Sequence, residues 1–236
     1  MKKNILVTGS SRGLGRFISV SFSKEGHNVF GFSRSNKQNL NFSTYKCDLL
    51  NVINIKKNLL KLKKKYKKLD SLILCAGDSK KYYNKTESYH DWVKCFDSNF
   101  YSATNLIESY LSIFKNKQTK ILIISSIAGT KVLKTSITYA VAKASLNFYS
   151  RFKAKELAQY NISLNVISPG NILMSGNNWD KKMSKNKRSV LKYIRETVPN
   201  NKFCNGIELF ELCKYLILKT DNAIGSNFII DGGQSI

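Results

Sequence analysis

A glycine-rich turn between an apolar segment and an amphipathic one constrains the fold of this chain most strongly. The apolar segment, Ile5 to Val7, resembles a buried strand, and the residues after the turn carry apolar side chains at helical spacing. Gly9, Gly13 and Gly15 let the backbone turn tightly, and the N-terminus of the following helix directs unpaired N–H groups at whatever lies beside the turn. This order predicts the first unit of a parallel α/β sheet with a site for a pyrophosphate.

The rest of the chain alternates strand-like and helix-like segments. Further strands are expected in HNVFGFSRS (ending near Phe32), Phe42 to Lys46, SLILCAG, ILII, ISLNVISPG and NFIIDGG. Helices are expected in VINIKKNLLKLKKKYKKLD, from about His90 to Phe114, in TYAVAKASLNFYSRFKAKEL and in IELFELCKYLILK. A length of 236 residues allows one sizeable core, and no internal repeat or linker divides the sequence. We therefore predict a single α/β domain over residues 1–236.

The charge of the chain is strongly positive. A net charge of +24, from 39 Lys and Arg against 15 Asp and Glu, ordinarily points to nucleic acid, anionic lipid or an acidic protein partner. The lysines are spread over most of the chain, and no recognised nucleic-acid-binding motif accompanies them. We therefore expect a solvated basic surface and no specific nucleic acid partner, while attraction of anionic substrates stays open.

The first residues of the sequence, its apolar stretches and its cysteines indicate where the protein is located. Met1-Lys2-Lys3 runs directly into the first strand, and no apolar stretch approaches the ~18 residues needed to span a bilayer. The five cysteines include no CxxC pair, which favours reduced thiols over a disulfide framework or a zinc site. We expect a cytoplasmic protein with no metal and no membrane partner.

The stretch SSIAGTKVLKTSITYAVAK brings a hydroxyl, a phenol and an ammonium into one region. Ser126 follows a buried strand, and Tyr139 and Lys143 are four positions apart in a helix pattern, so that both project from the same helix face. A neighbouring cation stabilises a phenolate and lowers its pKa, which makes Tyr139 a usable proton donor. The alternative is a buried helix that carries a Tyr and a Lys by chance, because the YxxxK spacing alone is common.

The end of the second predicted strand bears on the choice of dinucleotide. Enzymes that select NAD usually place an acidic residue there against the ribose hydroxyls, whereas this chain has Ser33 and Arg34. Arg34, helped by Arg12 in the glycine turn, can pair with a 2′-phosphate through charge-assisted hydrogen bonds. We therefore predict NADP(H), the alternative being two arginines that only face solvent. Asp48, after the third strand, is placed to accept the adenine amino group.

Five motifs resemble those of the short-chain dehydrogenase/reductase family in order and spacing. Thr8 to Gly15 match its TGxxxGxG turn, Asp48 its adenine-binding acid, and Pro169-Gly170 and Asp231-Gly232-Gly233 its later landmarks. The positions of its catalytic tetrad are matched by Asn99, Ser126, Tyr139 and Lys143. The interval of 13 residues between Ser126 and Tyr139 also fits the family.

The resemblance implies a Rossmann-like, doubly wound parallel sheet of about seven strands with helices on both faces, and a homodimer or homotetramer. It also implies hydride transfer between a carbonyl and a secondary alcohol. Tyr139 would protonate the carbonyl oxygen and Ser126 would hold it. Lys143 would bind the nicotinamide ribose and lower the pKa of Tyr139, and Asn99 would hold a water of the proton relay. The implied cofactor contacts are Gly9, Ser11, Arg12, Gly13, Leu14, Gly15, Ser33, Arg34, Asp48, Leu49, Ala76, Gly77, Tyr139, Lys143, Pro169, Gly170 and Ile172.

Two segments depart from the family pattern. The family's NNAG is replaced by Leu74-Cys75-Ala76-Gly77, which removes amides that usually brace the central strands. The threonine often found after Pro169-Gly170 is absent, with Asn171 to Met174 in its place, so that its hydroxyl contact to the cofactor's carboxamide is lost.

The polar, lysine-rich segment 171–200 is expected to be a substrate lid. Asparagines and a tryptophan suit hydroxyl-rich sugars, and the candidate residues are Asn171, Asn177, Asn178 and Trp179.

PGNILMSGNNWDKK also resembles family members associated with surface-polysaccharide and flagellin-glycan synthesis, so we favour a sugar or other polyhydroxylated substrate. The alternative within the family is a 3-oxoacyl-[acyl-carrier-protein] reductase. Two alternatives from other classes stay open: a non-catalytic NADP-sensing protein and a nucleic-acid-binding module.

Overall fold

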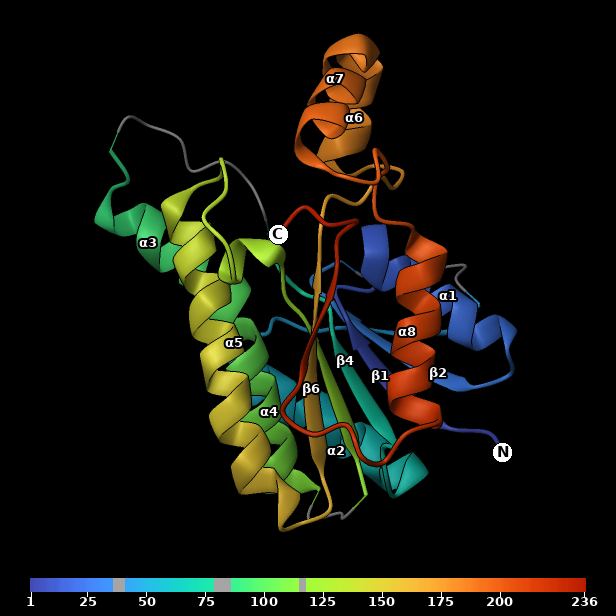
Figure 1. Ribbon diagram of the computed structural model, residues 1–236. Helices are drawn as coiled ribbons and strands as arrows, with labels where there is room; N and C mark the ends of the chain where they lie inside the picture. Colours follow the sequence, from blue (N-terminus) through green and yellow to red (C-terminus); the bar gives the residue numbers. More distant parts are fainter. Residues whose placement is uncertain (36–40, 79–85, 115–117) are drawn as a thin grey trace.

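The fold is known from a computed structural model that describes residues 1–35, 41–78, 86–114 and 118–236. In these residues seven parallel strands form one sheet in the order β3-β2-β1-β4-β5-β6-β7 (Figure 1). The strands are β1 (Asn4–Thr8), β2 (Asn28–Ser33), β3 (Ser43–Lys46), β4 (Ser71–Leu74), β5 (Lys120–Ile124), β6 (Ser163–Pro169) and β7 (Asn227–Ile230). The strand order reverses between β1 and β4, which is where open α/β sheets bind ligands. The predicted doubly wound parallel sheet is confirmed.

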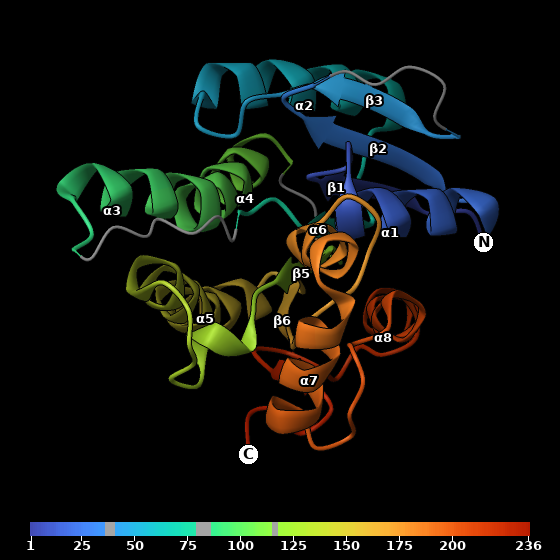
Figure 2. The same cartoon turned by 90° about the horizontal axis from the view of Figure 1, so that it is seen from above.

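Helices cover both faces of this sheet. They are α1 (Gly13–Lys24), α2 (Val52–Tyr66), α3 (Tyr89–Phe96), α4 (Ser102–Ile113), α5 (Ile137–Ala158), α6 (Asn178–Lys185), α7 (Lys187–Thr197) and α8 (Gly206–Leu218). Figure 2 shows α2, α4 and α5 on one side of the sheet and α1 and α8 on the other. Two buried apolar clusters follow this division, one containing Leu59, Leu106 and Leu146, the other containing Ile18 and Phe210.

The central strands read as continuous apolar runs because both of their faces are buried. In β5, Ile121 and Ile123 pack into the cluster beneath α2, α4 and α5, whereas Leu122 and Ile124 pack into the cluster beneath α1 and α8. Alternate side chains of a strand point to opposite faces, so a strand between two helical layers needs apolar residues at every position. This explains why the strand predictions agree with the structure to within about three residues.

Two helical regions differ from the sequence prediction. The single helix expected from His90 to Phe114 is instead α3 and α4, joined by the π-helical turn η1 (Asp97–Tyr101). The segment expected to be a lid, for which no helix was predicted, folds into α6 and α7, which Figure 1 shows beyond the carboxyl edge of the sheet. Asn177 caps α6 and Asn186 caps α7. These two caps were the available sequence signals for the helices, since asparagine is a favoured N-cap residue.

In the part of the chain that the structure describes, none of the helices combines the length and the apolar character that crossing a lipid bilayer requires.

Candidate active site

Ser126, Tyr139 and Lys143 meet at the carboxyl end of β5. Ser126 follows the strand and accepts the N–H of Ala128 at 3.2 Å as the chain enters the short 3-10 turn η2 (Ile127–Gly129). Its side chain also hydrogen-bonds to Tyr139 of α5. Lys143, one turn further along α5, is 3% exposed and donates to the carbonyl oxygen of Ile124 at 3.3 Å. The structure therefore brings together the hydroxyl, the phenol and the ammonium that the sequence analysis selected.

Asn99 completes this group from the π turn η1. A Cβ placed on Gly77 would lie 2.9 Å from Asn99 Oδ1 and 3.4 Å from Lys143 Nζ, so the two side chains flank the same glycine. Asn99 Oδ1 accepts the N–H of Asp78 at 3.1 Å, and its Nδ2 donates to the Asp78 carbonyl at 3.0 Å and to the Cys95 carbonyl at 3.1 Å. The amide of Asn99 thus braces the segment after β4. Its proposed role in holding a water stays a prediction.

The electrostatics of the pair on α5 are dominated by burial. Burial raises the pKa of Tyr139, and the charges of Cys95 and Asp78 add to this, while the hydrogen bond with Ser126 lowers it. Burial lowers the pKa of Lys143 to about 8. Lys143 Nζ lies 5.8 Å from the centre of the Tyr139 ring. The expectation that Lys143 gives Tyr139 a net lowered pKa is wrong, because the loss of hydration outweighs the lowering by the hydrogen bond with Ser126.

The glycine turn forms a cradle at the N-terminus of α1. Arg12 is the N-cap residue, and within the described residues its side chain makes no capping hydrogen bond to the first turn. Gly13 has a φ of +54°, and a Cβ placed on it would meet no described atom within 4 Å. A Cβ on Gly15 would instead lie 2.6 Å from the carbonyl oxygen of Gly9, so the turn requires glycine there. Uncapped N–H groups beside open space fit the pyrophosphate of a dinucleotide.

Lys143 fits the other end of such a cofactor. Its ammonium has three N–H groups, of which one hydrogen bond, to Ile124, is made within the described part of the chain. A buried ammonium is costly unless its donors find partners. The hydroxyls of a ribose would supply such partners beside Tyr139.

The predicted adenosine end lies at the carboxyl ends of β2 and β3. Arg12 and Arg34 are exposed there, and a Cβ on Gly31 would lie 2.4 Å from Ser10 Oγ, so the loop after β1 is in contact with strand β2. Asp48 Oδ1 accepts the N–H of Leu50 at 3.0 Å, and its other carboxylate oxygen has no hydrogen bond among the described residues. That oxygen can accept an amino group, as predicted for adenine. Ser33 and Leu49 are buried beside these residues, and Ser11 lies in the glycine turn.

Thr8 compensates for one of the departures from the family pattern. Its hydroxyl oxygen accepts the N–H of Ala76 at 3.0 Å and so ties the end of β1 to the end of β4, where the amides of an NNAG motif are missing. The contact was not predicted, although Thr8 belongs to the glycine turn. It shows that the central strands keep a side-chain brace.

The turn after β6 packs against the C-terminal segment. Gly170 donates its N–H to the Ile230 carbonyl at 3.0 Å, and a Cβ on it would lie 2.9 Å from Asp231 Cα. Ile172 forms an isolated parallel bridge with Cys204. The chain that leaves Pro169 is therefore anchored on both sides before it enters the lid.

The lid candidates make contacts within the protein. The Trp179 ring stacks on Tyr193, with centres 5.2 Å apart, and Lys182 Nζ lies 4.1 Å from the centre of the ring. Asn177 accepts the N–H of Asp180 as the cap of α6 and donates to the Ile172 carbonyl at 2.7 Å, and Asn171 donates to Gln234 at 3.0 Å. Asn178 is exposed on α6. These contacts hold the lid together, and substrate binding by the four residues stays a prediction.

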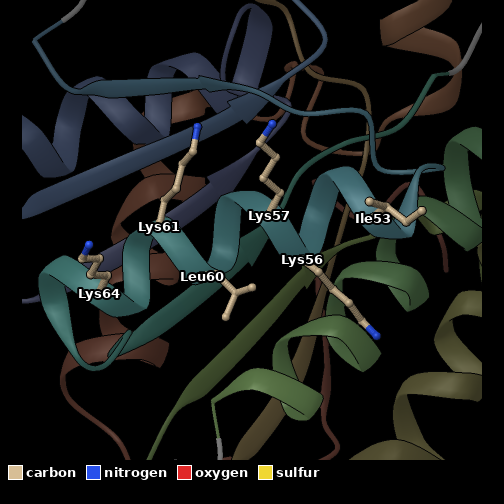
Figure 3. Close-up of a pocket in the computed structure, with 6 residues that line it drawn as sticks. All are labelled: Ile53, Lys56, Lys57, Leu60, Lys61 and Lys64. Carbon is tan, nitrogen blue, oxygen red and sulfur yellow. The ribbon is translucent and has the colours of Figure 1, made fainter.

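A shallow hollow of about 520 Å³ lies on the outer face of α2. It is lined by Ile53, Lys56, Lys57, Leu60, Lys61 and Lys64, and Figure 3 shows Lys57 and Lys61 pointing to one side of the helix and Lys56 and Leu60 to the other. The lysines are exposed, while Ile55, Leu59 and Leu62 are buried on the opposite face. This agrees with the expectation that the α2 lysines form a solvated face, and we assign the hollow no part in the active site.

Comparisons with known proteins agree with this geometry. The sequence model of the short chain dehydrogenase family matches residues 3–186. The 3-oxoacyl-[acyl-carrier-protein] reductase FabG of Escherichia coli is 30% identical over 177 residues, which cover 71% of this chain and 72% of that protein.

Solved structures show the same fold. A short chain dehydrogenase from Leptospira borgpetersenii with bound NAD+ has a TM-score of 0.88 at 23% identity and covers 100% of this chain and 94% of its own. ElxO with NADP bound has a TM-score of 0.90 at 24% identity, with 99% of each chain covered. At this level of identity the two structures establish the architecture alone.

Proposed function

Since the chain belongs to the short chain dehydrogenase family of oxidoreductases, we propose that it interconverts a carbonyl and a secondary alcohol with NADP(H) as cofactor. The observation that carries the proposal is the convergence of Ser126, Tyr139 and Lys143 at the carboxyl end of β5, with Asn99 beside them. A buried ammonium next to a hydrogen-bonded phenol is a proton-transfer site and has no evident structural purpose.

The side chains of this site act on the proton and on the oxygen of the substrate. Bound NADP(H) supplies or accepts the hydride. Tyr139 donates its proton to the carbonyl oxygen during reduction, and the Ser126 hydroxyl, which is bonded to Tyr139, holds that oxygen in reach. Burial raises the pKa of Tyr139, so the phenol holds its proton at neutral pH and releases it only when the phenolate is stabilised. Lys143 holds the ribose and stabilises the phenolate that forms.

The choice of NADP(H) is supported by the charges at the end of β2. Both NAD+ and NADP occur in the similar solved structures. In this chain, Arg34 follows the buried Ser33, and Arg12 is exposed in the neighbouring glycine turn. Two guanidinium groups favour a 2′-phosphate, whereas an acidic residue at this position would repel it.

Two substrate classes are supported to different degrees. We favour a sugar or other polyhydroxylated carbonyl compound, on the resemblance of residues 169–182 to glycan-synthesis members of the family and on the exposed Asn178. The packing of Trp179 against Tyr193 leaves less of this ring for a sugar than the sequence led us to expect. The relative FabG favours the second candidate, a reductase of 3-oxoacyl thioesters carried by an acidic protein, which the charge of +24 would attract.

A panel of carbonyl substrates tests the proposal. We expect NADPH absorbance to fall with sugar nucleotides or ketoses, with kcat/KM for NADPH roughly 10-fold or more above that for NADH, because only NADPH offers a 2′-phosphate to Arg34. Acetoacetyl thioesters of coenzyme A and of acyl carrier protein, and simple ketones, form the other arms. Faster turnover of the acyl carrier protein thioester would establish the second candidate, and no turnover of any carbonyl would contradict the proposed activity.

We further propose that the chain, as a single unit over 1–236 with a lid at 171–200, works as a homodimer or homotetramer in the cytoplasm. Exposed apolar side chains recur along one face of α5: Ile137 is 60% exposed, Phe148 62% and Phe152 68%, with Val141 at 37%. The spacings of four, seven and four residues place them on one stripe. A continuous apolar stripe on a surface helix favours an interface with another copy of the chain.

Charge on this stripe is expected to separate the subunits. The double change Phe148→Asp and Phe152→Asp would place carboxylates in an apolar interface, which is strongly unfavourable. Light scattering should then give the mass of a monomer, while the wild type gives a dimer or tetramer. Ile53→Asp, at an 81% exposed apolar position on α2, is the matched control and should leave the mass unchanged. A wild-type monomer would refute the assembly.

A further inference from the structure

A carboxylate from a distant part of the chain caps the helix that carries Tyr139 and Lys143. Glu87 Oε2 accepts the backbone N–H of Thr138 at 2.9 Å, across 51 positions of sequence. Glu87 precedes α3, and Figure 1 shows α3 beside the N-terminal part of α5. Since α5 begins at Ile137, Thr138 is its second residue and Tyr139 its third.

The first turn of α5 depends on this contact because its own sequence caps it weakly. The opening N–H groups of a helix have no partner within the helix and fray unless something accepts them. Ser136 is the N-cap residue, but its Oγ accepts the N–H of Tyr139 at the long distance of 3.4 Å. The first turn, ITYA, contains no acidic residue. Glu87 therefore supplies the anionic cap that α5 lacks, and its charge suits the positive end of the helix dipole.

The same contact region joins α5 to Asn99. Cys95, fully buried on α3, hydrogen-bonds to the side chains of both Thr138 and Asn99. Thr138 is itself fully buried, with its hydroxyl 2.6 Å from Ser136 Oγ. The backbone of Thr138 is thus held by Glu87, and its side chain is held by Ser136 and Cys95. The next residue along the helix is Tyr139.

We propose that Glu87 is a positioning residue, which fixes the phenol of Tyr139 against Ser126 by capping α5 through the Thr138 amide. The inference rests on the proposed oxidoreductase activity. Lys143 lies one turn deeper in the helix and has its own bond to Ile124, so loosening the first turn affects the proton transfer more than the hold on the cofactor. A displacement of about 1 Å in a reacting group can slow a reaction on the order of 100-fold.

Two variants of Glu87 separate capping from general stability. Glu87→Ala removes the acceptor, and we expect kcat to fall roughly 10- to 100-fold while KM and the Kd of NADPH stay within about 3-fold. Glu87→Gln keeps an acceptor oxygen and should return kcat to within about 5-fold of wild type. Asn51→Ala is the matched control, because Asn51 caps α2 by accepting the N–H of Asn54 at 2.9 Å and α2 carries no residue of the tetrad. It should lower Tm without changing kcat.

Hydrogen exchange measured by mass spectrometry gives a readout that needs no substrate. Amides of residues 136–143 should exchange faster in Glu87→Ala than in wild type, and at the wild-type rate in Asn51→Ala. Unchanged exchange in Glu87→Ala, or a kcat that falls equally in Asn51→Ala, overturns the inference. A wild type that turns over no carbonyl refutes the proposed activity instead, and the exchange rates still decide whether Glu87 caps α5.

Discussion

Tyr139→Phe should lower kcat for carbonyl reduction by roughly 100- to 10,000-fold, the usual contribution of a positioned general acid. The change removes the hydroxyl that bonds to Ser126 and keeps the ring that lies 5.8 Å from Lys143 Nζ. Because Lys143 and the glycine turn are untouched, NADPH should bind with a Kd within about 3-fold of wild type. Steady-state kinetics and a fluorescence titration with NADPH measure the two quantities.

Tyr149→Phe is the matched control on the same helix. The Tyr149 hydroxyl donates to Glu108 at 3.0 Å, so this variant also loses one phenolic hydrogen bond, but far along α5 from Ser126. It should keep wild-type kcat. Full turnover in Tyr139→Phe would show that Tyr139 is not the proton donor, whereas a wild type that binds NADPH and turns over no carbonyl would favour the alternative of a protein that binds the dinucleotide without catalysis.

Local periodicity explains which parts of the fold were predictable. The apolar run ILII predicts a buried strand, and the spacing of Ile55, Leu59 and Leu62 predicts a helix with one buried face. Each pattern is contained within a few residues of sequence, and the structure confirms both. Tyr139 and Lys143 were found in the same way, because a separation of four residues fixes a shared helix face.

Contacts between distant segments explain what the sequence could not show. Asn99 lies in a π turn where its amide bonds to Asp78, and nothing in the pattern of residues 90–114 marks the break in the helix. Trp179 stacks on Tyr193, in a second helix of the lid, and a cap of α5 comes from Glu87. Each of these features depends on a contact between segments that are distant in the sequence, and local propensity and residue spacing do not predict such contacts.

The direction of the Tyr139 pKa shift was also beyond the sequence. A YxxxK spacing places a cation near a phenol, but the net shift depends on how far both groups are removed from water. Burial raises the pKa of Tyr139 and lowers that of Lys143 to about 8, so burial disfavours the charged form of both groups. We infer that the ribose hydroxyls, by giving the Lys143 ammonium partners, would favour its charged form and so help to stabilise the phenolate.

Arg34→Ala should weaken the binding of NADPH much more than the binding of NADH. We expect the Kd of NADPH to rise roughly 10- to 150-fold, as for loss of a hydrogen bond to a charged group, while the Kd of NADH stays within about 3-fold. Arg34→Asp should raise the Kd of NADPH more than Arg34→Ala does, because a carboxylate repels the 2′-phosphate. It should also favour NADH, because the carboxylate can accept hydrogen bonds from the ribose hydroxyls. Titration of both nucleotides against each variant, followed by fluorescence, measures the effect.

The control for Arg34 must remove the same charge elsewhere on a basic surface. Arg151→Ala does so at an exposed position on α5 and should leave both dissociation constants unchanged. With a net charge of +24, the whole protein attracts anions, and this general attraction weakens as salt screens it. A local pairing of Arg34 with the 2′-phosphate predicts a preference for NADPH over NADH that persists in salt and is lost in Arg34→Ala but not in Arg151→Ala. Equal losses in the two variants would mean that the preference arises from the total charge, and the assignment of Arg34 would then be wrong.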